Sequence, residues 1–340
     1  MQPNRHILFI AVLIISFQLH GKQTSVSSNP ETKGVFELVT LGSTGGIQDG
    51  NLSAFLLRTL SEPNYIALDA GTLTNGINVA LSNNAFENLP MQTDNTLSTT
   101  GKILHHHIKG YLISHGHLDH VAGLLVASPE DNNKPIYGLK SVNQTMSDTY
   151  FNWQAWANFT DRGKPPLLNK YQVIDLVPQQ TTNLKGTQLK VKAFSLSHPL
   201  ESTAFVIEYE DNLFVYFGDT GPDKVEKQGK LAVVWEYLAK QMRTKKLRGV
   251  VIEVSFANDQ PDNLLFGHLT PKWLLSEMHY FYSLVADKQQ IKDMKVIISH
   301  IKYSLKSGTN PRLKIQQELN QGNTHGLKFI LAKQGQLLIL

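Results

Sequence analysis

Residues 114–120 read Ser-His-Gly-His-Leu-Asp-His and directly follow the apolar run Ile108–Ile113. The stretch places three histidines and one aspartate, four potential metal ligands, within six residues. A strand that ends in a turn can direct such side chains toward one point, and imidazole and carboxylate groups together suit Zn²⁺, Mn²⁺ or Fe. A His-rich surface loop is the alternative, but the H-x-H-x-D-H spacing favours a metal site.

Further candidate ligands follow other apolar runs. His198, Asp219 and His300 each come shortly after the end of a strand-like segment. Side chains that follow several strands of one sheet can converge at the same edge of that sheet. Each of these three residues alone is compatible with a structural role. Together with residues 114–120 they predict two adjacent metal sites.

The composition restricts the kind of site. The chain has 340 residues, 13 histidines and no cysteine, which excludes disulfides, thiolate zinc sites and a cysteine nucleophile. Any metal must therefore be held by His, Asp or Glu. The 32 basic and 28 acidic residues give a formal net charge of +4, which is too small an excess to indicate a nucleic-acid polymer as the partner.

The N-terminal residues 1–25 have the build of a secretory signal peptide. Arg5 precedes the apolar run Ile7–Leu19, which lacks acidic residues and is shorter than the roughly 20 residues that a transmembrane helix needs. Cleavage is expected between His20 and Ser28, and an uncleaved anchor is the alternative. We expect an exported protein, periplasmic or secreted, without stable membrane insertion once the leader is removed. The oligomeric state is not predicted.

Residues 30–340 alternate between strand-like and helix-like patterns and predict one mixed α/β domain. Strands are expected at Val35–Leu41, Ala54–Leu57, Tyr65–Leu68, Ile108–Ser114, Val173–Leu176, Leu189–Phe194, Ala204–Tyr209, Leu213–Phe217, Val250–Val254, Lys295–Ile298, Leu327–Leu331 and Gln336–Leu340. Helices are expected near Thr74–Phe86, Val121–Ser128, Lys230–Thr244, Pro271–Ala286 and Pro311–Gln321. The last two strands, on either side of Gly335, predict a terminal hairpin.

The sequence resembles a known family over most of its length. The stretch His115–Pro129, HGHLDHVAGLLVASP, is similar to the signature of class II cyclic-nucleotide phosphodiesterases, which belong to the metallo-β-lactamase-fold superfamily. Other similar segments are Gly42–Gly46, Asp69–Thr72, Glu253–Phe256, Gly267–Pro271 and Ser299–Lys302. The resemblance runs from about Val35 to Leu340. It implies a four-layer αββα sandwich of two mixed sheets flanked by helices.

The same resemblance implies a centre of two divalent metal ions. One ion would be held by His115, His117 and His198, the other by Asp119, His120 and His300, and Asp219 would bridge them. Zn²⁺ is expected, with Mn²⁺ or Fe as alternatives, and Asp119 counts as a catalytic residue too. A metal-bound hydroxide would hydrolyse 3′,5′-cyclic AMP, with cyclic GMP as a second candidate, to the 5′-nucleotide.

Four residues are candidates for contacts with this small-molecule substrate. His268 lies in a His-x-Thr element that resembles one of related phosphodiesterases, and it is the candidate proton donor to the leaving O3′. Packing at a helix start is its alternative role. Lys302 is a candidate phosphate contact or a surface charge. Asn51 and Ser53 follow the glycine cluster 42–46, and they either line the site or form a turn.

The remaining aromatic and histidine patterns are less specific. Aromatic residues three apart in Tyr150–Phe159 predict a helix whose aromatic face packs in the core or stacks on the purine. The run His105–His107 is interpreted as a solvated stretch, and no role is assigned to His279 and His325. The glycine cluster could direct backbone N–H groups toward phosphate or only permit a tight turn.

The alternatives to a cyclic-nucleotide phosphodiesterase are three other kinds of enzyme with this fold and a metal-binding protein without catalytic activity. A lactamase or a thioesterase would use the same His/Asp cluster. An RNA-processing phosphodiesterase would need an added basic or Gly-rich arm, and the sequence shows none. A metal-binding protein without activity would be expected to lack some ligands, whereas all seven are present.

Overall fold

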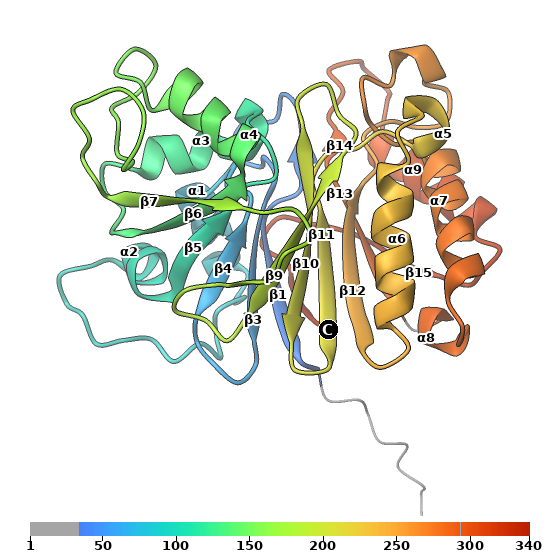
Figure 1. The fold of residues 1–340 in the computed structure, drawn as a ribbon, viewed down its shortest axis with the longest axis horizontal. Helices are drawn as coiled ribbons and strands as arrows, with labels where there is room; N and C mark the ends of the chain where they lie inside the picture. The colour runs from blue at the N-terminus through green and yellow to red at the C-terminus, as the bar shows by residue number, and fades with distance from the viewer. Residues whose placement is uncertain (1–33, 293) are drawn as a thin grey trace, which may run out of the picture. The chain divides into compact units, whose positions relative to one another are not determined.

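The computed structural model describes residues 34–292 and 294–340, and their strands form two large mixed sheets (Figure 1). The first sheet has the order β16 (Leu337–Ile339), β1 (Phe36–Gly42), β3 (Ala54–Thr59), β4 (Tyr65–Leu68), β5 (Ile108–Leu112), β6 (Lys134–Leu139) and β7 (Tyr171–Leu176). The second has the order β15 (Lys328–Leu331), β13 (Lys295–Ser299), β12 (Lys246–Glu253), β11 (Asn212–Phe217), β10 (Ser202–Tyr209), β9 (Lys190–Leu196) and β8 (Thr182–Asn183). The predicted leader lies outside the described residues.

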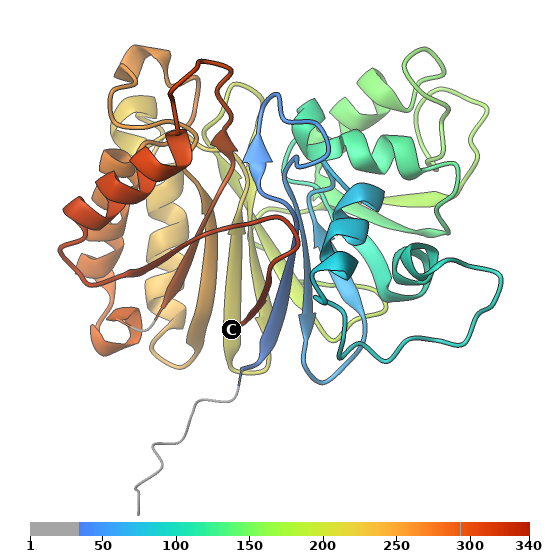
Figure 2. The ribbon, with the colours of Figure 1, turned by 180° about the vertical axis from the view of Figure 1, so that it is seen from behind.

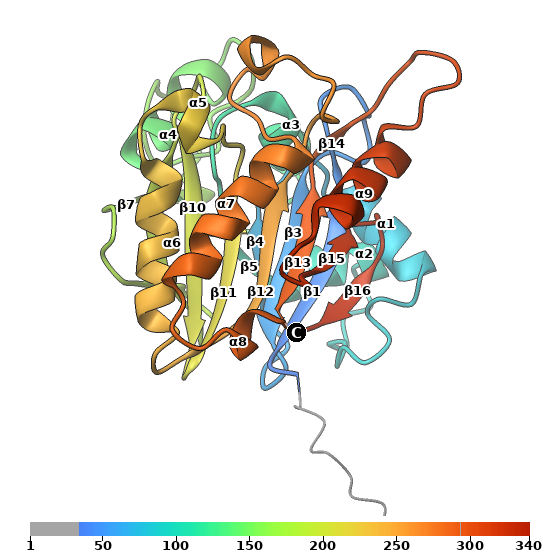
Figure 3. The same cartoon turned by 90° about the vertical axis from the view of Figure 1, so that its right-hand side faces the viewer.

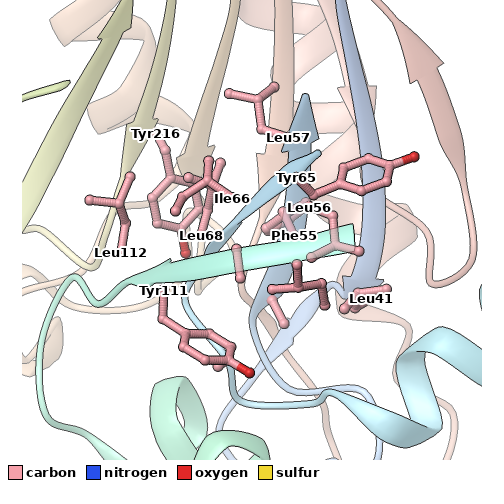
Figure 4. Packing of buried hydrophobic residues seen from close by; sticks show 14 of the residues in the cluster. Leu41, Phe55, Leu56, Leu57, Tyr65, Ile66, Leu68, Tyr111, Leu112 and Tyr216 are labelled. Atoms are coloured by element: carbon pink, nitrogen blue, oxygen red, sulfur yellow. The ribbon is translucent and has the colours of Figure 1, made fainter. Parts of the chain in front are cut away.

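The two sheets pack face to face through apolar side chains. Strands β1, β3 and β4 are buried at every position, as expected for strands that are covered on both faces. Aromatic rings of the first sheet meet those of the second: the ring centroids of Phe36 and Phe214 are 6.2 Å apart, and those of Phe55 and Tyr216 are 5.9 Å apart. Figure 4 shows Phe55 and Tyr216 within this core.

Helices cover the outer faces of both sheets. They are α1 (Thr74–Ser82), α2 (Thr99–Lys102), α3 (Leu118–Ala127), α4 (Lys140–Thr145), α5 (Asp223–Glu226), α6 (Lys230–Gln241), α7 (Pro271–Leu284), α8 (Gln289–Lys292) and α9 (Pro311–Gly322). Helices α1, α3 and α4 lie over the first sheet, and α6, α7 and α9 lie over the second (Figures 1 and 3). The predicted four-layer αββα sandwich is therefore confirmed.

The outer core of the second sheet shows why these helices form. Trp235 of α6 is fully buried, with its ring 4.8 Å from Phe217 of β11 and 5.0 Å from Phe281 of α7. Helices α7 and α9 begin at Pro271 and Pro311, as predicted, because proline has no N–H that the first turn would leave unpaired. Within the described residues, no helix is both long and apolar enough to cross a membrane.

The predicted terminal hairpin is wrong. Gly335 turns the chain in a left-handed conformation with φ +76°, but the strands on either side of it enter different sheets. Strand β15 pairs in parallel with β13, whereas β16 pairs antiparallel with β1. Figure 2 shows the C-terminal chain passing from the helices of the second sheet to the first strand.

The predicted aromatic helix at Tyr150–Phe159 is also wrong. A π-helical turn at Met146–Tyr150 ends there, and the segment continues in bends. The side chain of Asn152 accepts hydrogen bonds from the next backbone N–H groups, Gln154 and Ala155, each at 2.9 Å. This local pairing competes with helix formation. Of the aromatic side chains in the segment, only that of Phe151 is fully buried in the core.

Strand β6 was not predicted from the sequence. Pro135 and Gly138, residues that disfavour strands, lie in its six-residue run, and it begins at a lysine. Lys134 is nevertheless buried, because its ammonium group pairs with Asp131 at 2.8 Å and donates to the carbonyl of Leu104 at 2.7 Å. Tertiary pairing with β5 and β7 therefore overrides weak local propensity.

Candidate metal centre and active site

The loops that follow several strands bring all seven predicted metal ligands together. His115, His117, His198 and Asp219 form one group, and Asp119, His120 and His300 form a second, with the ligand atoms of each group within 4.8 Å of one another. Asp219 and His300 also form an overlapping group with His268. The sequence distances involved are large, so the convergence depends on the two sheets lying face to face.

The start of helix α3 separates the ligands of the motif. His115 lies in the extended segment after β5, and His117 precedes the helix with extended backbone angles of φ −69° and ψ 148°. Asp119 and His120 fall in the first helical turn, while Leu118, between His117 and Asp119, is 58% exposed. One short stretch can therefore serve both ligand groups.

Asp219 lies between the two groups. Its Oδ1 is 3.3 Å from Nε2 of His120, and its Oδ2 is 3.2 Å from Nε2 of His300. The same Oδ2 is 3.7 Å from Nε2 of His115 and 3.9 Å from Nε2 of His198. One carboxylate thus faces histidines of both groups, as a bridging ligand would.

Hydrogen bonds fix the orientation of most of these imidazoles. In four of them Nδ1 has a partner outside the ligand cluster: His115 with Ser114 Oγ (3.1 Å), His120 with Asp69 Oδ2 (2.7 Å), His198 with the Gly267 carbonyl (2.9 Å) and His300 with Ser255 Oγ (2.9 Å). Nε2 of each ring is then the nitrogen left to face the centre.

His117 is oriented the other way around. Its Nδ1 faces Nε2 of His115 at 3.0 Å and Nε2 of His198 at 3.1 Å. Burial lowers the pKa of His198 to about 4 and holds the pKa of His115 well below its usual value. Both rings are therefore neutral near pH 7, which is the form that binds a metal ion.

The residues fit divalent metal ions. The buried Nε2 of His120 has no hydrogen-bond partner among the described residues, and buried polar atoms are normally paired. Three ring nitrogens of the first group point at one another, and the donors are all imidazole or carboxylate. Such a donor set suits Zn²⁺, Mn²⁺ and Fe alike, so it does not select one of them.

Two glycines let the loop at 42–46 approach the ligands. A Cβ on Gly45 would lie 2.1 Å from Cε1 of His300, so no larger residue fits there. The backbone N–H of Gly46, which has φ +77°, donates to Oδ2 of Asp119 at 2.8 Å. In this structure the N–H of Gly46 supports a predicted metal ligand and is therefore not free for phosphate.

Sequence reasoning missed two buried acids that orient histidines of the site. Asp69 follows β4 and accepts hydrogen bonds from His120, Ser114 and Tyr216. Glu253 ends β12, where its Oε1 contacts Nδ1 of His268 at 2.8 Å. The available signal was the one used for Asp219, an acid at the end of an apolar strand.

A cavity of about 490 Å³ opens onto the cluster. The ligands His117, Asp119, His198, Asp219 and His300 line it, together with His268 and Lys302. This volume lies in the range of small-molecule sites. Apolar side chains complete the lining, so the cavity combines a charged floor with an apolar rim.

The family model for class-II cAMP phosphodiesterases matches residues 36–335. The chain belongs to this family. A curated relative, the 3′,5′-cyclic-nucleotide phosphodiesterase of Aliivibrio fischeri, is 45% identical over 316 residues, which cover 92% of this chain and 96% of the relative. These matches confirm the resemblance found in the sequence.

Solved structures confirm the fold of this family member. The crystal structure of unliganded yeast PDE1 matches with a TM-score of 0.77 at 23% identity, covering 90% of this chain and 100% of the other. The metallo-β-lactamase fold protein YhfI from Bacillus subtilis matches with a TM-score of 0.56 at 16% identity, covering 89% and 99%.

The predicted substrate contacts of this phosphodiesterase-family chain separate into two sets. His268 and Lys302 line the cavity. Asn51 lies in the loop after β2 (Thr44–Gly45), where its side-chain oxygen accepts from the backbone N–H of Ser43 at 3.0 Å. Ser53 is buried behind the same loop, with its hydroxyl 3.5 Å from the carbonyl of Thr44. The structure places these two in the loop framework, outside the lining.

The other histidines of the described residues, 105–107, 279 and 325, lie outside the ligand groups. The run 105–107 is solvated only in part. His105 and His106 are partly exposed, and His106 pairs with Asp94 at 2.9 Å, whereas His107 is buried, with Nδ1 2.9 Å from the Pro63 carbonyl. His279 and His325 stack on each other, with ring centroids 5.1 Å apart.

Proposed function

We propose that this protein is a metal-dependent phosphodiesterase that hydrolyses 3′,5′-cyclic nucleotides to 5′-nucleotides. The family match over residues 36–335 and the name of the Aliivibrio relative support the reaction. The observation that carries the proposal is the position of Asp219, which faces histidines of both ligand groups at the floor of a cavity. Cyclic AMP is the first candidate substrate, and cyclic GMP is the second.

We assign one divalent ion to His115, His117 and His198 and another to Asp119, His120 and His300, with Asp219 as the shared ligand. When bound, two such ions would supply Lewis acidity that polarises the phosphate and makes water a better nucleophile near neutral pH. Zn²⁺ is the proposed metal, with Mn²⁺ or Fe as alternatives. The hydrogen bonds to Nδ1 of the histidines keep the ligand atoms aimed at the centre.

His268 supplies the proton that the reaction needs. Formation of the 5′-nucleotide breaks the bond between phosphorus and O3′, and O3′ leaves with negative charge. Burial opposes protonation of His268, but the Glu253 carboxylate outweighs it and raises the pKa of His268 above its usual value. Since Nδ1 contacts Glu253, Nε2 is the donor atom. Lys302, which lines the same cavity, contributes positive charge for the phosphate oxygens.

The other enzymes of the fold are not favoured. The family match is to cyclic AMP phosphodiesterases and covers nearly all the described residues, whereas lactamases, thioesterases and RNA-processing enzymes share the fold alone. The assay that tests the proposal compares cyclic AMP, cyclic GMP, a β-lactam and a thioester with the purified protein in Zn²⁺ or Mn²⁺. Turnover of the lactam or the thioester without turnover of either cyclic nucleotide would refute it.

We also propose that the protein is exported, with the periplasm as its compartment. The support is the sequence of residues 1–25, a basic start and an apolar run of signal-peptide length. The test is N-terminal sequencing of the protein recovered from a periplasmic fraction. A mature N-terminus between residues 21 and 29 is expected, and an intact Met1 in a cytoplasmic fraction would contradict export.

A further inference from the structure

Three large apolar side chains surround the mouth of the catalytic cavity. Ile47, Leu118 and Phe266 line it and are exposed by 62%, 58% and 62%. Exposed apolar side chains are ordinary when scattered, but a group of them beside a polar pocket indicates a binding surface. We call these three residues the apolar rim. They indicate that part of the bound ligand is apolar.

The backbone beside each rim residue is fixed to the ligand cluster. Gly46, which precedes Ile47, donates its N–H to Asp119. Leu118 lies between two predicted ligands. Phe266 precedes Gly267, whose carbonyl contacts Nδ1 of His198 at 2.9 Å. The rim thus comes from two loops and the first residue of α3, each anchored on the centre that would hold the phosphate.

Phe266 also has an unfavourable backbone conformation. Its φ is +53°, in the left-handed region, where a bulky non-glycine residue is a clear outlier. Strain of this kind is retained where the surrounding structure imposes it and is concentrated at binding and catalytic sites. Here it holds an aromatic ring largely in solvent at the cavity mouth.

We propose that Phe266 stacks on the nucleobase of the bound cyclic nucleotide and that Ile47 and Leu118 complete its apolar contact. This inference rests on the proposed function, because it needs a phosphate at the His/Asp cluster. The base is the flat, weakly polar part of such a molecule, and the rim is the apolar surface that the same cavity offers. Stacking on an aromatic ring accepts every base, so this contact serves cyclic AMP and cyclic GMP alike.

The test separates binding of the base from chemistry at phosphorus. The full-length sequence is expressed with Phe266→Ala, with Phe266→Tyr, and with Leu264→Ala as a matched control. Leu264 is 43% exposed in the turn Asp262–Leu264 just before the rim residue, outside the cavity lining. Each protein is assayed with cyclic AMP, with cyclic GMP and with a methyl riboside 3′,5′-cyclic phosphate, which has no base.

Phe266→Ala is expected to raise KM for both cyclic nucleotides about 5- to 30-fold and to leave kcat within about twofold of wild type. A contact that stabilises the bound substrate and the transition state equally affects KM alone. kcat/KM for the base-free diester stays unchanged, and Phe266→Tyr and Leu264→Ala resemble the wild type. Calorimetry should show weaker binding of AMP and unchanged binding of ribose 5-phosphate.

Two results would overturn the stacking role. One is an unchanged KM for cyclic AMP in Phe266→Ala. The other is an equal loss with the base-free diester, which would show that the substitution disturbs the centre through Gly267. Failure of the proposed function looks different, because the wild type itself would then turn over neither cyclic nucleotide.

Discussion

Replacing Asp69 by asparagine tests whether this buried carboxylate sets the metal affinity of the centre. Oδ2 of Asp69 accepts from Nδ1 of His120 at 2.7 Å, from Ser114 Oγ at 2.7 Å and from the Tyr216 hydroxyl at 2.6 Å. Oδ1 accepts from the backbone N–H of Ser114 at 2.7 Å. An amide of the same shape has only one oxygen, so its NH₂ group must face at least one of these donors.

The magnitude follows from what is lost. If the amide oxygen keeps the Oδ2 position, the N–H of Ser114 is left without an acceptor, and a buried unsatisfied donor costs about 1–3 kcal/mol. Loss of the carboxylate also removes the charged group that orients His120. Removal of such a partner typically lowers metal affinity about 10- to 100-fold, which corresponds to about 1.4–2.8 kcal/mol.

The assay is chelator competition for Zn²⁺, accompanied by urea unfolding of the metal-free protein. We expect one of two binding steps to weaken by the stated factor and the unfolding free energy to fall by about 1–3 kcal/mol. Asp94→Asn is the matched control, because Asp94 contacts His106 at 2.9 Å outside the cluster. Metal affinity of Asp69→Asn within twofold of wild type would refute the reasoning.

Three further substitutions probe the centre and the helical layer. Gly45→Ala should lower kcat/KM at least about 100-fold, because its Cβ would force the ring of His300 to move. Asp119→Ala should abolish turnover of cyclic AMP while the melting temperature of the metal-free protein stays within a few degrees. Burial and then the Asp223 carboxylate raise the pKa of Glu277 to about 7, so the folded state binds its proton more tightly than the unfolded chain does. The resulting stabilisation is present below about pH 4.5 and is lost as the pH rises through 7. The free energy of unfolding falls by about 3 kcal/mol at most over this range, and Glu277→Gln should remove this part of the pH dependence.

Each substitution has a control. Gly101→Ala, in α2, adds a Cβ with ordinary contacts of 3.4 Å or more and should leave kcat/KM unchanged, and an equal effect of both glycine substitutions would contradict the contact with His300. A near-full rate in Asp119→Ala would remove this residue from the catalytic centre. Glu236→Gln, on the exposed face of α6, should keep the wild-type pH profile of unfolding in urea. If Glu277→Gln also keeps the wild-type profile, the assignment of this pH dependence to Glu277 is wrong.

The sequence predicted the layers well because their strands are strongly apolar. Segments such as Tyr65–Leu68 and Leu213–Phe217 match the observed strands closely, since a strand buried on both faces leaves a continuous apolar run. The partner of β16 could not be predicted, because its pairing with β1 spans nearly the whole chain and leaves no local signal. Strand β6 was missed because its proline, glycine and buried lysine resemble a loop.

In the candidate site, too, some residues could be predicted from the sequence and others could not. The H-x-H-x-D-H spacing and the acid after a strand identified groups that the structure brings together. Asp69 and Glu253 lie in segments that carry the family resemblance, and each follows or ends an apolar strand, but this position does not show which histidine the acid contacts. The rim residue Phe266 could not be recognised either, because nothing in one sequence tells an exposed phenylalanine from a buried one.

The pairing of β16 with β1 has a consequence for how the protein is made. The N–H groups of Val35 and Phe36 both donate to the carbonyl of Leu340, at 2.6 and 3.1 Å. A ribosome produces Val35 long before Leu340, so one edge of β1 stays open until the residues of β16 have been made. Contacts between the two ends of a chain form slowly, and an open strand edge can pair with other chains. The first sheet is therefore completed only after β16 has been made and has paired with β1.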